Sequence, residues 1–469
     1  MDLEIKSSPH LGYWIKNNLD YAMKIKNICC IGAGYVGGPT MAVIALKCPH
    51  INITVVDANP DRIKAWTGPL DKLPIYEPGL SDVVKEARGR NLFFSDDIAG
   101  NIEKAEMIFM AVNTPTKTEG EGAGMKADLR NIEACARDIA KYSKKDKIVV
   151  EKSTLPVRTA EKVKEILYEN STDIHFEILS NPEFLAEGSA IQDLFKSDRV
   201  LIGGDDSESG QNAVEALVDI YANWIPKEKI LTTNVWSSEL AKLASNAMLA
   251  QRISSINSLS GLCEKTGANI DELSKAIGMD QRIGPKFLKA SAGFGGSCFQ
   301  KDILNLVYLC KFYGLDEEAE YWHQVVKIND NQKKRFAQKV IDYFNGDLTG
   351  MRIAILGWAF KANTNDSRES ASIKVSEILY KSGASITIYD PMVQKRSIVN
   401  DIESLWDTKV NLNDKRINIV EKISETKKCD TFVIITEWEE FKLIDVEESK
   451  IIFDGRNINQ NKNKISIGK

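Results

Sequence analysis

A buried strand that runs straight into a glycine-rich turn restricts the fold of this chain more than any other feature. Residues 26–31 form the expected strand, residues 32–38 the turn, and a helix follows. A second expected strand, residues 53–56, ends in Asp57, which lies 20 residues after Gly37. Glycines at such a turn let a pyrophosphate approach and let the helix pack closely on the strand. The pattern therefore predicts an α/β domain that binds a dinucleotide.

The acid at the end of the second strand indicates which dinucleotide is bound. The carboxylate of Asp57 can accept both ribose hydroxyls, which favours NAD over NADP, although Arg62 lies close enough in sequence to keep NADP open. The alternative is a glycine turn in an α/β sheet that binds no ligand. The residues expected to hold the cofactor here are Gly32, Ala33, Gly34, Tyr35, Val36, Gly37, Asp57 and Arg62.

Three further expected strands, residues 106–112, 148–151 and 176–180, each end in a polar loop. Ligands of open α/β sheets bind at the carboxyl ends of the strands. One such loop alone is more often plain turn chemistry or helix capping, but three loops at one rim favour a functional site. The candidate residues in these loops are Val112, Asn113, Thr114, Pro115, Thr116, Ser153, Thr154, Glu183, Phe184, Leu185, Ala186 and Glu187.

Length and composition limit the class of protein. A chain of 469 residues is too long for one core, and about three domains are expected. Hydrophobic residues make up 43% and charged residues 27%, and the net charge of -5 argues against a nucleic-acid partner. The eight cysteines lack the spacing of a zinc site or a disulfide framework, so no metal is expected. Without a signal core or a membrane-length apolar run, we expect a cytoplasmic protein with a small-molecule partner and no membrane.

A long helical region without strands is expected from Asn234 to about Gly278. Its apolar face is broad, which indicates a core or a subunit interface. Lys242 and Asn246 are spaced i, i+4 and place an ammonium and an amide on one face of this helix. They are candidate site residues, the alternative being a solvated lysine and a surface asparagine.

A second glycine-rich stretch, from Gly293 to Asp302, contains a cysteine where a helix pattern begins. A helix N-terminus favours the thiolate form of Cys298, and Lys301 adds a positive charge nearby. Asp302 follows at i+4, so its carboxylate and the sulfur share one face. The pattern predicts a nucleophile beside an acid/base group. The alternative is a glycine turn with a buried cysteine.

A second α/β unit is expected after residues 345–347, with strands in 351–356, 385–389, 431–436 and 451–454. Its turn at Gly357 lacks the later glycines of the first, so this half should bind a different nucleotide or none. The expected division is an extension at 1–23, a cofactor domain at 24–233, a central helical and dimerisation domain at 234–345, and a second Rossmann-like domain at 346–469. Residues 457–469 are expected to form a mobile tail.

Taken together, residues 24–456 resemble the nucleotide-sugar dehydrogenases of the UDP-glucose 6-dehydrogenase family, and the animal-type members more than the short bacterial ones. The blocks that carry the resemblance are residues 30–38, 181–188, 237–243 and 293–302. The resemblance implies an α/β fold with two Rossmann-like doubly wound parallel sheets joined by a long central helix. It also implies NAD on the first domain, UDP-glucose as substrate, and a homo-oligomer that is a dimer or a trimer of dimers. Ala362 and Asn363 replace residues that are more often charged in animal relatives.

The resemblance also assigns roles. Cys298 would be the nucleophile, Lys242, Asn246 and Asp302 its polar partners, and Glu183 and Thr154 would complete the chemistry. Further cofactor contacts would come from Ser153, Glu187, Lys301 and Arg368. The substrate-binding set would comprise Glu183, Phe184, Leu185, Ala186, Glu187, Lys242, Asn246, Lys289, Phe294, Gly295, Phe360, Lys361 and Arg456, with Arg282 reaching in from the neighbouring subunit.

The chemistry implied is a four-electron oxidation of an alcohol to an acid through a thiohemiacetal and a thioester on Cys298. Two alternatives stay open at this point. A sister enzyme would act on GDP-mannose or a UDP-N-acetylhexosamine with the same residues, and a catalytically silent NAD-binding assembly module would use none of them. A two-electron hydroxyacyl-type dehydrogenase shares the architecture but has no use for a cysteine at a helix start.

Overall fold

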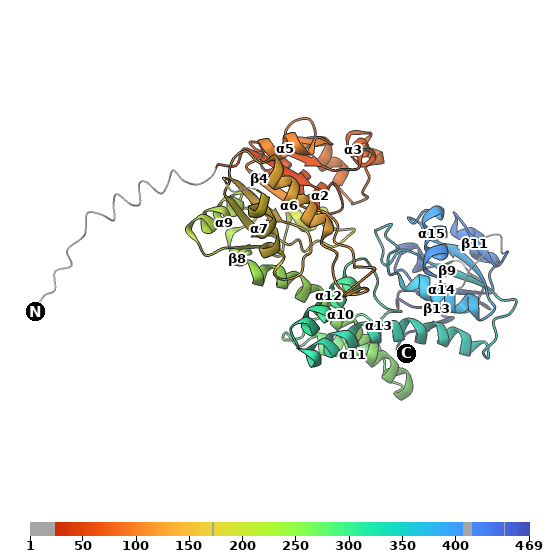
Figure 1. Ribbon diagram of the computed structural model, residues 1–469. Coiled ribbons are helices and arrows are strands. Elements are labelled where there is room, and N and C mark those ends of the chain that lie inside the picture. The colour runs from red at the N-terminus through yellow and green to blue at the C-terminus, as the bar shows by residue number, and fades with distance from the viewer. Residues whose placement is uncertain (1–23, 171–172, 407–414, 445) are drawn as a thin grey trace, which may run out of the picture. The chain divides into compact units, whose positions relative to one another are not determined.

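The computed structural model describes residues 24–170, 173–406, 415–444 and 446–469 (Figure 1). The expected extension at 1–23 lies outside these residues. The chain divides into two compact units. The first ends at Lys242 and omits residues 116–126, which belong with Leu243–Lys469 in the second.

The first unit is built on a sheet of eight strands in the order β3-β2-β1-β4-β5-β6-β7-β8. The neighbours from β3 to β6 are parallel, which confirms the doubly wound fold, and the order reverses on either side of β1. β7 runs antiparallel to β6, and β8 is parallel to β7. The last two strands were not predicted, and they extend the sheet beyond the cofactor half.

Side chains that alternate along the strands build two separate cores on the two faces of this sheet. Ile28 and Cys30 of β1 belong to the core beneath α2 and α4, whereas Cys29 and Ile31 belong to the core beneath α6 and α7. Because both faces are covered by helices, the strands read as continuous apolar runs, and this is why they could be recognised in the sequence. The elements of this unit are β1 (Asn27–Ile31), α2 (Gly37–Lys47), β2 (Asn52–Val56), α3 (Pro60–Thr67), α4 (Leu80–Ala87), β3 (Leu92–Ser95), α5 (Ile98–Lys104), β4 (Met107–Met110), α6 (Arg130–Tyr142), β5 (Lys147–Glu151), α7 (Thr159–Asn170), β6 (Phe176–Ser180), α8 (Ala190–Phe195), β7 (Val200–Gly204), α9 (Glu208–Tyr221) and β8 (Ile230–Asn234).

Helix α10 (Val235–Thr266) is the long helix expected after the first sheet. It ends at Thr266 because the next residue, Gly267, has a φ of 78°, a left-handed conformation that suits glycine. The predicted helical stretch is thus divided into α10 and α11 (Ile270–Gly278). In the second unit α10 packs with α12 (Phe299–Phe312) and α13 (Asp316–Tyr343) around a small core that includes Ala247, Phe294 and Val307. This is the central helical region.

The second unit also contains a parallel sheet of six strands in the order β11-β10-β9-β12-β13-β14. Its elements are β9 (Arg352–Leu356), α14 (Ala371–Lys381), β10 (Ser385–Tyr389), α15 (Lys395–Leu405), β11 (Ile417–Ile419), β12 (Thr431–Ile434), β13 (Ile452–Asp454) and β14 (Lys464–Ser466). The order on either side of β9 repeats the arrangement on either side of β1. A second Rossmann-like sheet is thereby confirmed.

The structure corrects the expectation of a mobile tail at residues 457–469. β14 pairs in parallel with β13 and forms the edge of the second sheet. The end of the chain is held further by hydrogen bonds of Gly468 with Ile270 and Glu264 and by an ion pair between Lys469 and Asp271. The composition rich in Asn and Lys was misleading because a three-residue edge strand needs few apolar side chains.

Candidate functional site

Gly32, Gly34 and Gly37 of the turn after β1 differ in the room that they leave for a ligand. A Cβ on Gly32, whose φ is 111°, would lie 2.5 Å from the carbonyl oxygen of Ala111, and one on Gly37 would lie 2.0 Å from the oxygen of Gly32. By contrast, among the described residues no atom beyond the two chain neighbours lies within 4 Å of the place where a Cβ of Gly34 would be. Two glycines thus serve close packing and the third faces open space before the N-terminus of α2. This cradle fits the pyrophosphate of a dinucleotide.

Asp57 lies at the end of β2 and is tied to the same turn. Its Oδ2 accepts hydrogen bonds from the backbone N–H of Ala33 at 2.9 Å and from Nη1 of Arg62 at 3.0 Å. Asp57 is buried, whereas the Arg62 side chain is 40% exposed. The carboxylate is therefore held at the glycine turn, where a ribose would lie, and Arg62 is positioned beside it.

The loops after β4 and β5 are joined by hydrogen bonds. The hydroxyl of Thr114 donates to the carbonyl oxygen of Thr154 at 3.0 Å, and the hydroxyl of Ser153 donates to that of Val112 at 2.7 Å. Asn113 accepts a bond from Asn131 at the start of α6. The structure thus brings these predicted residues together at the carboxyl end of the sheet, next to the switch point at β1. Thr116, by contrast, belongs to the second unit.

A buried group of charges follows β5 and β6. Nζ of Lys242 lies 3.3 Å from Oε1 of Glu183, and both side chains are less than a tenth exposed. Among the described residues, none donates a hydrogen bond to Oε2 of Glu183. Lys242 is therefore not a solvated lysine, and the second carboxylate oxygen of Glu183 is open to a ligand or a proton.

Lys152 belongs to this group and was missed by the sequence reasoning. Its Nζ donates to Oδ1 of Asn181 at 3.0 Å and to the hydroxyl of Tyr221 at 3.2 Å. Burial lowers the pKa of Lys152 to about 8, while the charge of Glu183 acts in the opposite direction. The available signal was a lysine directly after a fully buried strand, where a charge needs a partner.

The loop after β6 holds its predicted residues in different environments. The Phe184 ring lies under the guanidinium of Arg199, 3.8 Å from ring centroid to Cζ, and 5.5 Å from Nζ of Lys242. Leu185 packs against the core beneath α2, and the N–H of Ala186 donates to Asp193. Glu187 precedes Gly188, whose N–H donates to Glu77. The loop is thus fastened at both ends, with Glu183 and Phe184 facing Lys242.

In the second unit, Cys298 lies at the N-cap position of α12, as the sequence predicted. The thiol is half-buried, and its Sγ lies 3.6 Å from the hydroxyl oxygen of Ser297. One turn on, Asp302 is almost completely buried, and one of its oxygens lies 3.7 Å from Nζ of Lys301. Nδ2 of Asn246 donates to the other oxygen of Asp302 at 2.6 Å. The start of α12 thus presents a thiol and, one turn on, a carboxylate, and α10 adds the amide of Asn246.

The glycine loop before Cys298 packs against the segment after β9. A Cβ on Gly295 would lie 2.5 Å from the backbone oxygen of Glu369, and the N–H of Gly296 donates to the carbonyl oxygen of Arg368. Phe294 is buried, and its backbone is held on both sides by the Asn329 amide. The glycines are therefore needed because two backbones lie in contact here.

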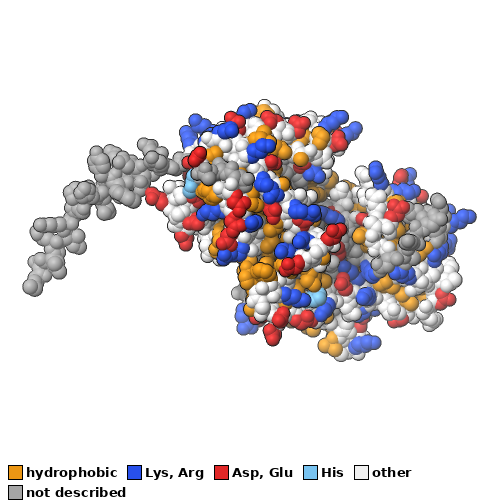
Figure 2. All heavy atoms as spheres, viewed as in Figure 1, with side chains coloured by type: hydrophobic (Ala, Val, Ile, Leu, Met, Phe, Trp, Pro, Cys, Tyr) orange, Lys and Arg blue, Asp and Glu red, His pale blue; other side chains and the backbone are white. Residues whose placement is uncertain are grey.

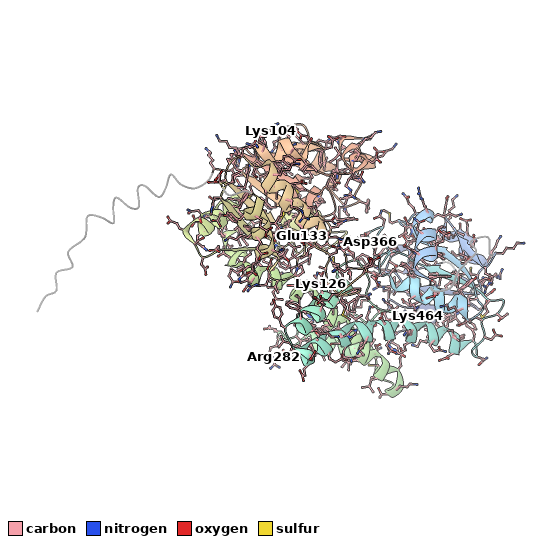
Figure 3. All side chains as sticks on the ribbon, viewed as in Figure 1. Lys104, Lys126, Glu133, Arg282, Asp366 and Lys464 are labelled. Atoms are coloured by element: carbon pink, nitrogen blue, oxygen red, sulfur yellow. The ribbon has the colours of Figure 1, made fainter. Side chains whose placement is uncertain are left out.

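Three predicted substrate residues, Phe360, Lys361 and Arg456, contact one another next to this loop, whereas Lys289 and Arg282 have exposed side chains. Nη2 of Arg456 donates to the backbone oxygen of Phe360 at 2.6 Å, and Nζ of Lys361 lies over the Phe360 ring. Arg368 pairs with Asp366. Lys289 is exposed. Arg282, labelled in Figure 3, is 88% exposed at the edge of the helical region and pairs with Asp280.

The turn after β9 resembles the first turn but is closed. Oδ2 of Asp390, at the end of β10, accepts from the N–H of Trp358 at 2.7 Å, from that of Ala359 at 2.9 Å, and from the Trp438 indole at 3.2 Å. A Cβ on Gly357 would lie 2.3 Å from Thr436. Asp390 thus holds this turn as Asp57 holds the first, but the buried Trp358 and Ala359 stand where the first turn has Ala33 and the open Gly34. The loss of the open glycine is in keeping with a different nucleotide, or none, at this turn.

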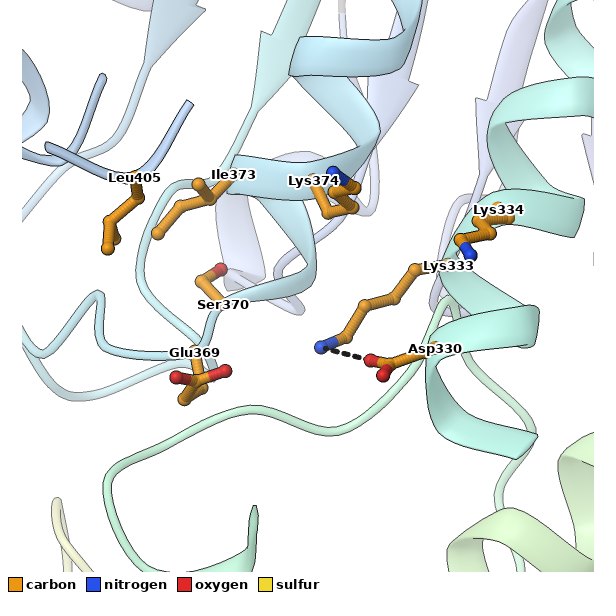
Figure 4. Close-up of a pocket in the computed structure, with 8 residues that line it drawn as sticks. All are labelled: Asp330, Lys333, Lys334, Glu369, Ser370, Ile373, Lys374 and Leu405. Atoms are coloured by element: carbon orange, nitrogen blue, oxygen red, sulfur yellow. Dashed lines mark ion pairs between the residues drawn. The ribbon is translucent and has the colours of Figure 1, made fainter. Parts of the chain in front are cut away.

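A cavity of about 320 Å³ lies between α13 and the start of α14 (Figure 4). The ammonium of Lys333 points into it and pairs with Asp330 at 3.6 Å, and Glu369 and Ser370 line the opposite side. The stem of Lys333 lies against Gly293. The cavity thus adjoins the glycine loop, and the sequence reasoning did not find its residues.

Surface charge, helix hydropathy, metal-ligand grouping and the state of the cysteines further describe the protein around this site. Acidic and basic side chains are interspersed on the face shown in Figure 2. Among the described residues, no helix is both long and apolar enough to cross a membrane. Within the same ranges, no three His, Cys, Asp or Glu side chains are grouped as metal ligands would be. All eight cysteines are free thiols.

Two Rossmann-like sheets, an open glycine turn with its acid, and a helix-start cysteine beside a buried carboxylate define a dehydrogenase that binds a dinucleotide. Comparison with known proteins agrees. Residues 26–225 match the NAD binding domain of the UDP-glucose/GDP-mannose dehydrogenase family, residues 236–331 its central domain and residues 354–461 its UDP binding domain. The chain belongs to the UDP-glucose/GDP-mannose dehydrogenase family.

Similar proteins come from plants, animals and archaea. The chain is 55% identical over 448 residues to UDP-glucose 6-dehydrogenase 1 of Glycine max, covering 92% of this chain and 93% of the relative. It is 56% identical over 446 residues to UDP-glucose 6-dehydrogenase of Gallus gallus, covering 93% and 90%. A solved UDP-glucose dehydrogenase from Pyrobaculum islandicum aligns with a TM-score of 0.82 and 30% identity, covering 95% of this chain and 98% of the other.

Proposed function

We propose that this protein oxidises UDP-glucose to UDP-glucuronate with two molecules of NAD, through covalent intermediates on Cys298. The observation that carries the proposal is the arrangement at α12, where Cys298 occupies the N-cap and Asp302, hydrogen-bonded to Asn246, follows one turn later. Family membership and the 55% identity to UDP-glucose 6-dehydrogenases support the substrate.

The residues of the first unit fit NAD. The open space at Gly34 receives the pyrophosphate, and Asp57 accepts hydrogen bonds from the adenosine ribose. The joined loops at Thr114 and Ser153 border the nicotinamide end at the carboxyl edge of the sheet. When bound, NAD supplies the hydride acceptor for each of the two oxidations.

The first oxidation removes a proton from the C6 hydroxyl and a hydride from C6, which leaves an aldehyde. Two carboxylates are candidate bases for that proton, Glu183 and Asp302, and each is buried. Glu183 has an oxygen that receives no hydrogen bond from the described residues, whereas Asp302 is shared with Asn246 and Lys301. Thr154 lies in the loop after β5 that borders the cofactor.

The second oxidation requires that the aldehyde stays bound. The Cys298 thiolate adds to the aldehyde carbon, and the resulting thiohemiacetal oxygen takes a proton. Loss of that proton and of a hydride from the same carbon gives a thioester. Water then attacks the thioester, which releases the carboxylate product and restores the thiol. The helix N-terminus favours the thiolate at the first and last of these steps.

Lys242 and Asn246 stabilise the oxyanions that form along this path. They lie one turn apart on α10, so their head groups share one face of a continuous helix. Asn246 uses one N–H for Asp302 and has a second N–H to offer. A preorganised donor of this kind typically lowers a barrier by about 3 kcal/mol.

Polar and aromatic residues of each unit are proposed as contacts for UDP-glucose. The loop after β6 contributes Glu183, Phe184, Leu185, Ala186 and Glu187. The second unit contributes Lys289, Phe294, Gly295, Phe360, Lys361 and Arg456. For the cofactor, we propose further contacts from Lys301 and Arg368.

The test is an NADH assay across UDP-glucose, UDP-N-acetylglucosamine, UDP-N-acetylmannosamine and GDP-mannose. We expect two NADH per UDP-glucose and far lower kcat/KM with the other sugars. One NADH per sugar would contradict the covalent scheme. A preference for another nucleotide sugar would identify a sister enzyme, and absence of turnover with every sugar would favour a silent NAD-binding module.

We also propose that the protein is a homo-oligomer in the cytoplasm, either a dimer or a trimer of dimers. The helical region of the second unit exposes large apolar side chains at Met248, Leu262, Met279 and Phe287. Arg282, which resemblance assigns to the neighbouring site, is exposed on the same region. Eight free thiols accord with a reducing compartment.

Subunit mixing tests whether Arg282 acts across this interface. Arg282→Ala and Cys298→Ser subunits should each have very low activity alone. In a mixed dimer one site would combine the intact Cys298 of one subunit with the intact Arg282 of the other, so activity should partly return. No recovery in mixed dimers, verified by mass, would show that Arg282 acts within its own subunit.

A further inference from the structure

Two glutamates are buried against each other in the first unit without a positive charge between them. Glu151, the last residue of β5, and Glu239, in the second turn of α10, are 1% and 2% exposed. Among the described residues, no donor reaches either oxygen of Glu151. Glu151 pairs across the sheet with Ser180, whose carbonyl oxygen accepts a hydrogen bond from Ser238, the residue before Glu239. The carboxyl groups of Glu151 and Glu239 therefore lie in contact. Two buried carboxyl groups can be in such contact only when a proton lies between them.

The hydrogen bonds indicate which carboxyl group carries that proton. Both oxygens of Glu239 accept backbone bonds, Oε2 from Arg158 at 2.7 Å and Oε1 from Ala160 at 2.8 Å. An acceptor of two N–H groups is best as the anion. Glu151 is therefore the acid that donates to Glu239. Burial and the neighbouring charge of Glu239 raise the pKa of Glu151 well above its usual range.

The pair connects the proposed cofactor loop to the helix that carries Lys242. Glu151 directly precedes residues 152–158, which include Ser153 and Thr154. Glu239 closes the other end of that loop, where Arg158 has a left-handed φ of 77° and α7 begins at Thr159. The same part of α10 is fastened to β6, because the Ser238 hydroxyl donates to the oxygen of Ser180.

We propose that Glu151 and Glu239 are positioning residues that share one proton and thereby hold the loop of residues 152–158 in the conformation that binds NAD. This inference rests on the proposed function, since that function places the cofactor against Ser153 and Thr154. Loss of the proton would set two anions against each other and release the loop. The pair thus couples cofactor binding to pH.

Few other charges face the pair. Just before α7, the Arg158 guanidinium is turned to Glu161 and to the Trp236 ring. From the end of β5, Lys152 points to the other face of the sheet, toward Asn181 and Tyr221. The neighbours of Glu151 on β4 and β6 are Met110 and Ser180, which carry no charge. The proton balance of the pair is therefore set mainly by the two glutamates themselves.

The shared proton is tested through stability, without turnover. Unfolding exposes Glu151, which releases its proton above about pH 4.3, whereas the native pair retains it. The wild type should therefore lose stability as the pH rises. Between pH 5.5 and 8.5 its folding equilibrium constant should fall by up to about tenfold per pH unit relative to that of Glu151→Gln. Glu77→Gln, which replaces another buried glutamate of the first unit that accepts two backbone N–H bonds, is the matched control and should keep the wild-type dependence. Equal pH dependence in wild type and Glu151→Gln would overturn the shared proton.

The positioning role is tested by NAD binding to the folded proteins, followed by fluorescence. Glu151→Gln keeps a donor for Glu239 and should bind NAD within about twofold of wild type, without a decline at alkaline pH. Glu239→Gln replaces one of the two acceptor oxygens by a donor, so its affinity for NAD should be at least about tenfold lower than that of the wild type. Its affinity for UDP should be unchanged. NAD affinity equal to wild type in Glu239→Gln would overturn the positioning role. Wild-type protein that binds no NAD would instead contradict the proposed function.

Discussion

Asn246 on α10 donates a 2.6 Å hydrogen bond from its amide to Oδ2 of Asp302 on α12. The two residues belong to separate sequence motifs, one following Lys242 by a turn of helix and the other following Cys298 by a turn. Both are buried, so the bond is formed out of water. It orients the carboxylate and aligns two elements that the sequence could place only individually.

Replacing Asn246 should damage catalysis more than folding. We expect Asn246→Ala to lower kcat by about 10²-fold, the usual loss for one oxyanion donor. Asn246→Asp should be worse, because it sets a second buried carboxylate against Asp302. Gln251→Ala, which removes a bond to Ser255 on the same helix, serves as the control. Full turnover of Asn246→Ala would show that the amide is structural.

Replacing Cys298 tests the covalent path. Cys298→Ser should oxidise the alcohol once and then stall, because a serine ester is cleaved far more slowly or the hydroxyl does not add at all. Rapid mixing should show at most a burst of NADH, and intact mass should reveal any adduct. Cys310→Ser, a second half-buried thiol on the same helix, should behave as wild type. Near-normal steady turnover of Cys298→Ser would refute the thioester.

Replacing Lys242 should affect activity and stability together, because this lysine is ion-paired inside the protein. Lys242→Ala should reduce kcat by about two to three orders of magnitude. It should also lower the melting temperature, since Glu183 is left as a buried, unpaired carboxylate. Adding Glu183→Gln should restore stability but not activity. Ser237→Ala, an exposed position in the same helix, is the control for general damage. Wild-type turnover in Lys242→Ala would exclude a catalytic role.

Replacing Asp57 should change the choice of cofactor. The wild type should use NAD far better than NADP, because the carboxylate repels a 2′-phosphate. In Asp57→Ser the charge is removed and Arg62 loses its partner, so kcat/KM with NADP should rise while that with NAD falls. Equal use of both cofactors by the wild type would mean that Arg62 already determines the preference. Asp61→Ser, an exposed acid in the first turn of α3, is the control.

Replacing Lys152 should alter the alkaline stability of the first unit. Because the pKa of Lys152 is lowered to about 8 by burial, the unfolded lysine holds a proton at pH 9 that the native one has lost. Because of this group, the free energy of unfolding should therefore increase as the pH rises from about 8 to about 10.4. Lys152→Met should abolish that gain in thermal unfolding between pH 8 and 10. An unchanged pH dependence in Lys152→Met would show that the lysine stays protonated in the fold.

Much of the fold could be predicted because its signals are local. β1 and β6 were expected within one residue of their observed ends, since fully buried parallel strands read as short apolar runs. β3, β7, β8, β11 and β14 were not predicted. β8 exposes four of its five residues and β14 has only three, so neither carries the apolar run that marks a central strand.

The sequence by itself determined the two Rossmann-like sheets, the glycine turn with Asp57, and the position of Cys298 at the start of a helix. These depend on spacing along the chain, which backbone geometry translates directly into structure. Only the tertiary structure decided that Asn246 binds Asp302, that Lys242 is paired with Glu183, and that Glu151 meets Glu239. These partners are 56, 59 and 88 residues apart in the chain. No local pattern records such distances, because burial and charge pairing arise only when separate elements pack together.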